Sequence, residues 1–118
     1  MATEQQRASR KQEGRITRTF KQIQEDARRM MASGAMWFCK SDVVTQLFRI
    51  EAKTKVKPSK SITIQKEWLD KIELEAFETG KIGILAFSFG GSKDYLAIES
   101  TEFITLMEEL IELRGKVK

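Results

Sequence analysis

Three charged residues near the middle of the chain, Asp42, Glu51 and Lys53, have the types and spacing of a metal site. Glu51 and Lys53 are two positions apart in a segment of strand-like composition, so their side chains project from one face. Asp42 precedes them across a predicted short hairpin, where pairing brings its carboxylate within reach of the same divalent ion. The spacing therefore predicts a Mg²⁺ site, in which Mn²⁺ is expected to substitute.

This set suits the hydrolysis of a phosphodiester. Magnesium bound by hard oxygen ligands polarises a phosphate and lowers the pKa of a bound water. Lys53 would stabilise the developing charge or orient the nucleophile. The alternative is an ordinary surface ion pair between Glu51 and Lys53. The upstream aspartate and the apolar strand residues Leu47, Phe48 and Ile50 favour the metal site.

Composition narrows the possible chemistry. The 118 residues, 41% of them hydrophobic, are enough for one compact domain, and the net charge of +4 suits a polyanionic partner. With no histidine and one cysteine, Cys39, the chain cannot assemble a Ser-His or Cys-His nucleophile or a zinc site. No apolar stretch reaches the ~20 residues that span a bilayer, and no signal-peptide core opens the chain, so we expect a cytoplasmic protein without a membrane partner.

Hydrophobic periodicity predicts the elements of the first half of the chain. Residues 1–8 are expected to form a flexible arm, followed by a single domain over residues 9–118. A helix is expected from Ser9 through Ile16, Phe20 and Ile23, and its apolar stripe continues to Ala27 and Met30/Met31. A loop of small residues at Ala32–Ala35 and an extended run, Met36–Lys40, are expected to follow. The next expected element is a hairpin over Asp42–Lys53 that turns at Thr45-Gln46.

The second half of the chain continues the alternation of helices and strands. A basic loop, Thr54–Lys60, is expected to lead into a helix from Ser61 or Thr63 to Thr79, with Ile64 and Phe77 on its apolar face and Gly80 as its cap. Two strands, Lys81–Phe89 and Tyr95–Ile98, are expected to be joined by a turn at Gly90–Asp94. The final helix, Thr101–Arg114, is acidic and is expected to place Phe103, Met107, Leu110 and Ile111 in the core. This order predicts an α/β (mixed α+β) domain in which helices flank a small mixed sheet.

Three motifs together resemble one known family: Ser41-Asp42-Val43-Val44, Phe48–Thr54 and Ile62–Ile72. They are similar to those of the PD-(D/E)xK nuclease superfamily, and within it of the archaeal and phage Holliday junction resolvases. The resemblance implies a restriction-endonuclease-like core and a Mg²⁺-dependent endodeoxyribonuclease that cleaves branched DNA, most plausibly four-way junctions, as a homodimer. A phage-encoded protein would act in the host cytoplasm.

The resemblance also implies a first-helix glutamate as a further catalytic and metal-binding residue, which is Glu13 or, less favoured, Glu25. Gly14 beside Glu13 weakens the helix that must aim it. The catalytic set is then Glu13, Asp42, Glu51 and Lys53, with the three carboxylates as metal ligands. Ser41 stands where the family signature has proline. Ser33-Gly34-Ala35 matches the small flexible loop that precedes the aspartate in that group.

Basic residues cluster around the proposed site. The candidate DNA-binding residues are Arg10, Lys11, Arg15, Ser33, Lys40, Lys55, Lys57, Lys60 and Gln65. Lysines and arginines at such positions can track a phosphate backbone, although individually each could simply solvate the surface. Trp37 is preferred over Trp68 as a residue that stacks on unpaired bases, since helical spacing favours packing for Trp68.

Two alternatives to a junction resolvase stay open. One is a recombination or repair nuclease of the same superfamily that cuts linear or single-stranded DNA. The other is an accessory protein that binds DNA without cleaving it.

Overall fold

The computed structural model describes residues 1–24, 26–29 and 41–116. Its elements are α1 (Glu4–Lys21), β1 (Arg28–Arg29), β2 (Val43–Val44), β3 (Phe48–Thr54), α2 (Lys66–Glu78), β4 (Ile82–Ser88), β5 (Tyr95–Ala97) and α3 (Ser100–Lys116). The strands form one sheet in chain order, in which β3 and β4 are parallel and the other neighbours are antiparallel. The predicted mixed α+β class is confirmed, and the arrangement is consistent with a restriction-endonuclease-like core.

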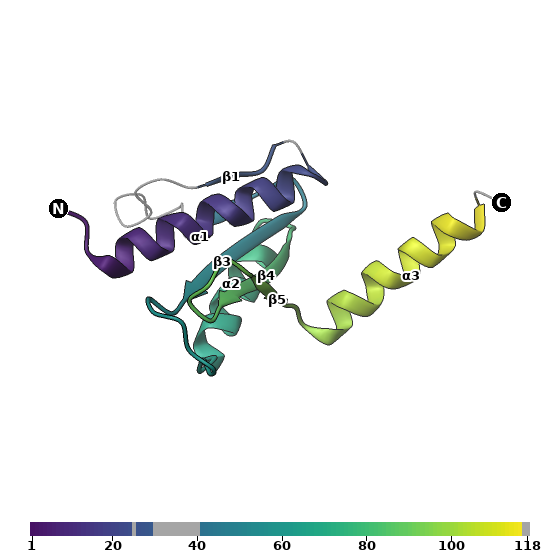
Figure 1. Cartoon of the computed structure of the whole chain (residues 1–118). Helices are drawn as coiled ribbons and strands as arrows, with labels where there is room; N and C mark the ends of the chain where they lie inside the picture. Colours follow the sequence, from purple (N-terminus) through teal and green to yellow (C-terminus); the bar gives the residue numbers. More distant parts are fainter. Residues whose placement is uncertain (25, 30–40, 117–118) are drawn as a thin grey trace.

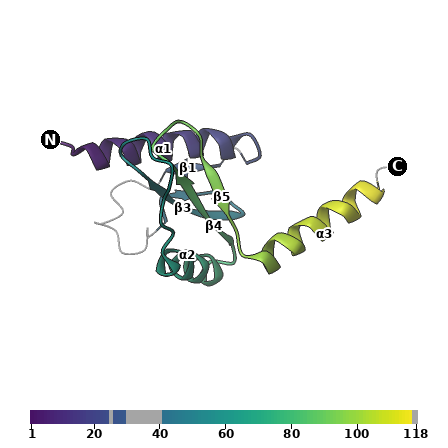
Figure 2. The ribbon, with the colours of Figure 1, turned by 60° about the horizontal axis from the view of Figure 1, so that its bottom comes forward.

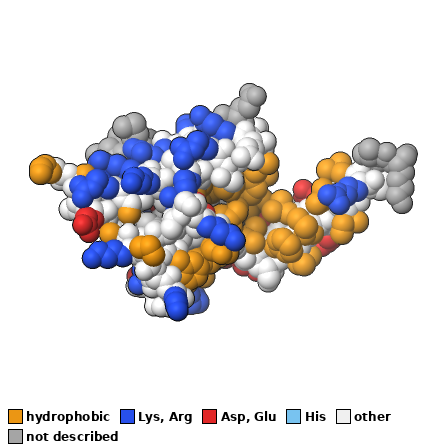
Figure 3. All heavy atoms as spheres, viewed as in Figure 1, with side chains coloured by type: hydrophobic (Ala, Val, Ile, Leu, Met, Phe, Trp, Pro, Cys, Tyr) orange, Lys and Arg blue, Asp and Glu red, His pale blue; other side chains and the backbone are white. Residues whose placement is uncertain are grey.

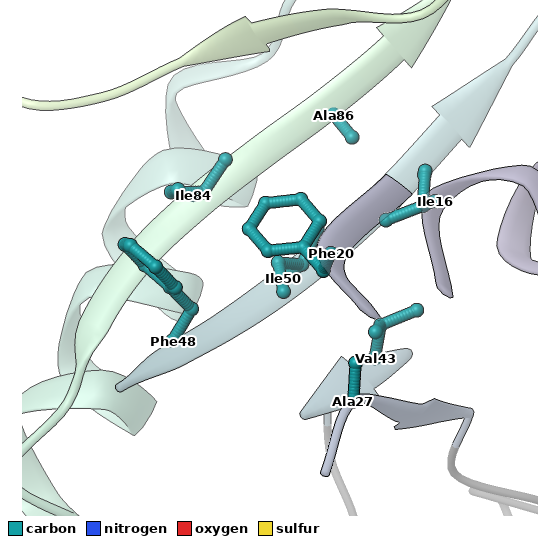
Figure 4. Packing of buried hydrophobic residues seen from close by; sticks show 8 residues of the cluster. All are labelled: Ile16, Phe20, Ala27, Val43, Phe48, Ile50, Ile84 and Ala86. Carbon is teal, nitrogen blue, oxygen red and sulfur yellow. The ribbon is translucent and has the colours of Figure 1, made fainter. Parts of the chain in front are cut away.

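Helices α1 and α2 cover opposite faces of the sheet (Figures 1 and 2). On the α1 face, Ile16 and Phe20 pack against Phe48 and Ile50 of β3, and the rings of Phe20 and Phe48 meet edge to face at 5.4 Å (Figure 4). On the α2 face, a Cβ added at Gly83 of β4 would lie 2.8 Å from the backbone oxygen of Ile72. Glycine thus lets α2 approach β4 closely.

The two faces of β3 differ in chemistry. Phe48, Ile50 and Ala52 pack in or against the hydrophobic core cluster beneath α1. Because strand side chains alternate between faces, Arg49, Glu51 and Lys53 lie on the α2 side. The face opposite the apolar core therefore carries the charged residues of β3, as the sequence pattern predicts.

The predicted bounds of the first helix are wrong at its start. Helix α1 begins at Glu4, so residues 4–8 are helical rather than a flexible arm. Thr3 and Gln6 form a capping box in which each side chain accepts the other residue's backbone N–H, at 3.1 and 2.8 Å. These bonds satisfy N–H groups that would otherwise lack partners at the helix end.

The predicted continuation of that helix is also wrong. Helix α1 ends at Lys21, Ile23 is 66% exposed, and Arg28–Arg29 pair with β2 as a short strand. Ala27 is buried in the core after a turn rather than on a helix face. The loop Ser33-Gly34-Ala35, the run Met36–Lys40 and Met30/Met31 lie outside the described residues.

Helix α2 starts later than expected, at Lys66, because Gln65 before it is extended with φ −86° and ψ 134°. Ile64 precedes the helix, and Phe77 is 83% exposed rather than on its buried face. Gly80 adopts φ 67° just past the helix end, as its predicted capping position requires. The turn after β4 also forms as predicted and pairs β4 with β5.

The predicted burial of the last helix is contradicted. Helix α3 contains no buried residue, and Phe103, Leu110 and Ile111 are 45%, 38% and 69% exposed. The helix leaves the sheet after β5 and projects away from it (Figures 1 and 2). The described chain is therefore 54 Å long, with a radius of gyration of 15.1 Å, against about 13 to 14 Å for a compact chain of this length.

Across the described ranges, no helix combines the length and apolar composition needed to cross a bilayer.

Candidate active site

Asp42 and Glu51 lie close together where the β2–β3 pair ends, and the charge of Asp42 raises the pKa of Glu51. The register pairs Val43 with Ile50, and the backbone N–H of Asp42 donates to the carbonyl of Ile50 at 3.0 Å. The charges of Lys71 and Glu75 on α2 act on both carboxyls. The predicted hairpin thus brings the two carboxylates together on the α2 side of the sheet.

A backbone hydrogen bond holds the side chain of Asp42. Its Oδ2 accepts from the N–H of Ala52 at 2.8 Å. Burial raises the pKa of Asp42 above its usual value, while that hydrogen bond and the charge of Lys53 act in the opposite direction. The carboxyl is therefore fixed in place in an environment that disfavours its charge.

Glu51 is 7% exposed and has two lysine neighbours. Its Oε2 lies 3.6 Å from Nζ of Lys53 and 3.9 Å from Nζ of Lys71. Its Oε1 is buried without a hydrogen-bond partner among the described residues. Burial, followed by the charge of Asp42, raises the pKa of Glu51 to about 7. A cation bound at this oxygen would stabilise the ionised form.

Glu13 reaches the neighbourhood of Asp42 from α1. Burial and, next, the charge of Asp42 raise its pKa to about 7, while Arg29 and Arg10 oppose the shift. Its Oε1 lies 3.4 Å from Nε of Arg29. Glu13 is thus coupled to Asp42 and engaged by a cation of β1. The alternative residue, Glu25, lies outside the described part of the chain.

The expected three-carboxylate metal set is not assembled. Among the described residues, no group of three or more His, Cys, Asp or Glu side chains could hold one metal ion. Asp42 and Glu51 remain a chemically suitable pair, because Mg²⁺ is commonly held by one or two carboxylates together with substrate phosphates and waters. The partnerless Oε1 of Glu51 is the oxygen best placed to become a ligand.

Helix α2 adds residues that the sequence reading did not assign to the site. Lys71 contacts Glu51, Trp68 lies under Lys53 with 4.7 Å from Nζ to the ring centroid, and the charge of Glu75 raises the pKa of both Asp42 and Glu51. Trp68, Lys71 and Glu75 recur at three- and four-residue steps, which places them on one helix face. That spacing is the feature of the sequence from which their shared position on α2 could have been predicted.

The hydroxyl of Ser41 joins two elements of the site. It is fully buried, its Oγ donates to Oε1 of Glu75 at 2.8 Å, and it accepts from Nη1 of Arg49 at 3.3 Å. The hydroxyl therefore joins α2 to the charged face of β3 immediately before Asp42.

Gln12 ties α1 to the strands of the site. It is fully buried, and its Nε2 donates to the carbonyls of Lys53 at 2.8 Å and Ala86 at 3.4 Å. The amide thus bridges β3 and β4 at the level of Lys53. This role of Gln12 could not be predicted from the sequence, because a glutamine inside a charged helix belongs to no distinctive pattern.

Two adjoining hollows collect several of the predicted DNA-binding residues. One, of about 410 Å³, is lined by Lys11, Arg15, Lys55 and Lys57 among others. The second, of about 540 Å³, is lined by Lys53, Lys55 and Gln65 among others, and it shares Thr54 and Lys55 with the first. Figure 3 shows Lys and Arg side chains concentrated over the α1 side of the molecule.

Other predicted DNA-binding residues are placed differently. Arg15 donates twice to the carboxylate of Asp94, both times at 2.9 Å, and so fastens α1 to the turn between β4 and β5. Arg10 and Lys60 are exposed and line neither hollow. Ser33, Lys40 and Trp37 lie outside the described residues.

No protein-family model, curated protein or solved structure matches this chain.

Proposed function

We propose that this protein is a Mg²⁺-dependent endonuclease that cleaves DNA phosphodiesters. The observation that carries the proposal is the proximity of Asp42 to Glu51, whose Oε2 lies 3.6 Å from Nζ of Lys53 and whose Oε1 has no hydrogen-bond partner among the described residues. Two neighbouring carboxylates and a lysine are the residue types that metal-assisted phosphoryl chemistry requires. The resemblance of the motifs around them to PD-(D/E)xK nucleases supports the same chemistry.

In the proposed mechanism, Asp42 and Glu51 would hold the metal, which when bound supplies Lewis-acid activation of the phosphate and of a water. Mn²⁺ would substitute for Mg²⁺. The hydrogen bond from Ala52 orients Asp42 before the metal arrives. Lys53 stabilises negative charge on the phosphate as the bond to the leaving oxygen breaks. Glu13, coupled to Asp42, acts as a positioning residue for it.

The substrate that we propose is branched DNA, with the four-way junction first, as the resemblance to resolvases implies. The two hollows, which share Thr54 and Lys55 at the end of β3, would provide a basic path for a phosphate backbone from Lys11 of α1 past Lys55 to Lys53. Such contacts attract DNA without reading its sequence. A location in the cytoplasm, or in the host cytoplasm for a phage protein, belongs to the same proposal.

A homodimer is part of this proposal, because symmetric cutting of a junction needs two active sites related by a two-fold axis. The uncovered apolar side of α3 supports it. At 100° per residue, the apolar residues of α3 occupy one half of the helix and the glutamates occupy the other. The apolar set is Phe103, Ile104, Leu106, Met107, Leu110, Ile111 and Leu113; Leu106 packs against the core, whereas Phe103, Ile104, Leu110, Ile111 and Leu113 are exposed. A second copy would bury this side.

The test is a cleavage assay on labelled four-way junction, linear duplex and single-stranded DNA, with Mg²⁺, with Mn²⁺ and with chelator. We expect metal-dependent cutting of the junction, and a loss of cutting with retained binding in Lys53→Ala. Cutting of all three DNAs at equal rates would favour the repair or recombination nuclease. Binding that ignores metal, with no cleavage of any DNA, would favour a non-catalytic accessory protein.

A further inference from the structure

The hollow that adjoins Lys53 has a composition beyond what phosphate binding requires. It lies between the amino-terminal half of α1, the end of β3 and the start of α2, and its volume is about 540 Å³. Volumes of about 300 to 1,000 Å³ are typical of small-molecule sites. Besides Lys53 and Lys55, its walls include Trp68, Ile62, Gln65 and Ser9.

These walls match the parts of a nucleotide. Lys53 and Lys55 are suited to a phosphate, the indole of Trp68 with Ile62 offers a flat apolar surface, and Gln65 offers an amide that can both donate and accept. Every nucleobase has a π-face that stacks on an aromatic side chain whatever its sequence. A purely electrostatic groove would need only the lysines.

Trp68 is also fixed relative to the proposed chemistry. Nζ of Lys53 lies 4.7 Å from the centroid of its ring and 3.6 Å from Oε2 of Glu51. A base that stacks on this face of the indole would displace Nζ of Lys53 from the ring and free it to contact the phosphate of the same nucleotide. A base within a duplex is stacked between its neighbours and has no face free for the indole. This arrangement therefore selects a nucleotide that is unpaired or unstacked.

We infer that the hollow beside Trp68 is a binding subsite for one unpaired DNA base, next to the phosphodiester that Lys53 contacts. The inference rests on the proposed nuclease function and deepens it, because it specifies which DNA the site recognises. The recognised feature is an unpaired base at the position that is cleaved. It assigns base stacking to Trp68, which lines the hollow, whereas Trp37, which the sequence pattern favours, lies outside the described residues.

Binding is tested in chelator, where no hydrolysis occurs, with a thymidine octamer and an octamer of abasic sugars that carries the same phosphates. The full chain with Trp37→Phe leaves Trp68 as its single tryptophan. We expect the thymidine octamer to quench the emission of Trp68 and to bind about tenfold or more tightly than the abasic octamer. The abasic octamer should leave the emission unchanged.

Trp68→Leu and Trp68→Phe form a matched pair, because both keep an apolar side chain and only phenylalanine keeps a ring. Leucine should abolish the preference for thymidine and leave abasic binding unchanged, while phenylalanine should retain most of the preference. Equal weakening of both octamers by leucine would overturn the subsite, because Trp68 would then act only by positioning Lys53 or supporting the fold. If the leucine variant fails to fold, the quenching experiment and the phenylalanine variant decide.

The two proposals fail separately. Base discrimination that depends on Trp68, with no cleavage of any DNA in Mg²⁺, would refute the nuclease and keep the subsite. Mg²⁺-dependent cleavage, with equal affinity for the two octamers and no change in Trp68 emission, would refute the subsite and keep the nuclease.

Discussion

The carboxylate of Asp42 accepts a hydrogen bond of 2.8 Å from the backbone N–H of Ala52, the residue between Glu51 and Lys53. One short contact thus links the first proposed metal ligand to the strand that carries the second ligand and the lysine. The bond holds the carboxylate in place whether or not a metal is bound. Substitutions of Asp42 can therefore distinguish the loss of this hydrogen bond from the loss of the negative charge.

The first prediction compares Asp42→Asn with Asp42→Ala. Asparagine retains an oxygen that can accept from Ala52 but loses the charge, so cleavage should fall by about a hundredfold or more with the fold preserved. Alanine also leaves the buried N–H without a partner, which costs about 1 to 3 kcal/mol of the free energy of unfolding. Junction cleavage and thermal unfolding measure the two effects. Full activity in the asparagine variant would remove Asp42 from the metal site.

The second prediction separates two lysines that contact the same oxygen. Lys53 and Lys71 lie 3.6 and 3.9 Å from Oε2 of Glu51, but Lys53 also lines the hollow beside Trp68. Lys53→Ala should lower the cleavage rate by about a hundredfold or more, because it removes a group that stabilises charge on the phosphate. Lys71→Ala, the matched control, should lower it by less than about tenfold. Equal losses would assign both lysines only to the electrostatics of Glu51.

The central trio could be predicted from sequence because its geometry is local. Alternation places Glu51 and Lys53 on one face, and a short antiparallel turn brings Asp42 close to Glu51. The bounds of the first helix were less predictable, because its start depends on the capping bonds between Thr3 and Gln6. Those bonds offset the weak apolar character of the first turn.

The contributions of α2 and α3 depend on how helices sit against the rest of the molecule. Spacing puts Trp68, Lys71 and Glu75 on one face of α2, but only the packing of that helix on β4 turns the face toward Glu51. In the same way, the amphipathic pattern of α3 predicts an apolar side without saying what covers it. The structure packs Leu106 of that side against the core and leaves most of the other apolar residues exposed.

The third prediction concerns pH without metal. Glu13 and Glu51 have pKa values of about 7, against 4.5 for the unperturbed group. Between these values the folded state binds more protons than the unfolded chain, so stability is greatest near or below pH 4.5 and falls as the pH rises through 7. The thermal midpoint in chelator should therefore drop by several degrees between pH 5 and pH 8.

Two measurements check that assignment. Glu51→Gln should reduce the pH dependence, because it removes one of the carboxyl groups whose pKa is raised in the folded state. Saturating Mg²⁺ should raise the midpoint more at pH 8 than at pH 5, because the metal needs ionised carboxylates. A midpoint that rises from pH 5 to pH 8 in chelator would contradict the shifted pKa values.

The fourth prediction uses neighbouring glycines in the turn between β4 and β5. Gly90 has φ 99°, and a Cβ there would lie 2.4 Å from the backbone oxygen of Lys57, whereas a Cβ at Gly91 meets nothing within 4 Å. Gly90→Ala should cost about 1 to 3 kcal/mol of the free energy of unfolding and displace the basic loop. Gly91→Ala should change stability by less than about 1 kcal/mol. Thermal unfolding and affinity for DNA in chelator distinguish them.

The fifth prediction tests the dimer through α3. Ile104 and Ile111 are 52% and 69% exposed on the apolar half of the helix. If a second copy covers this half, the double variant Ile104→Glu and Ile111→Glu buries two charges at the contact and should produce a monomer, because unpaired charges are strongly disfavoured in an apolar interface. Light scattering after size-exclusion chromatography gives the mass directly.

Thr105→Glu and Glu112→Gln, on the opposite half of α3, are the controls and should leave the dimer intact. The monomeric variant should still cut single strands in Mg²⁺, because Asp42, Glu51 and Lys53 come from one chain, but it should lose paired incision of a junction. A wild-type protein that is monomeric at all concentrations would refute the dimer. A monomeric variant that still cuts both strands of a junction in one binding event would refute the claim that symmetric cleavage needs a dimer formed through α3.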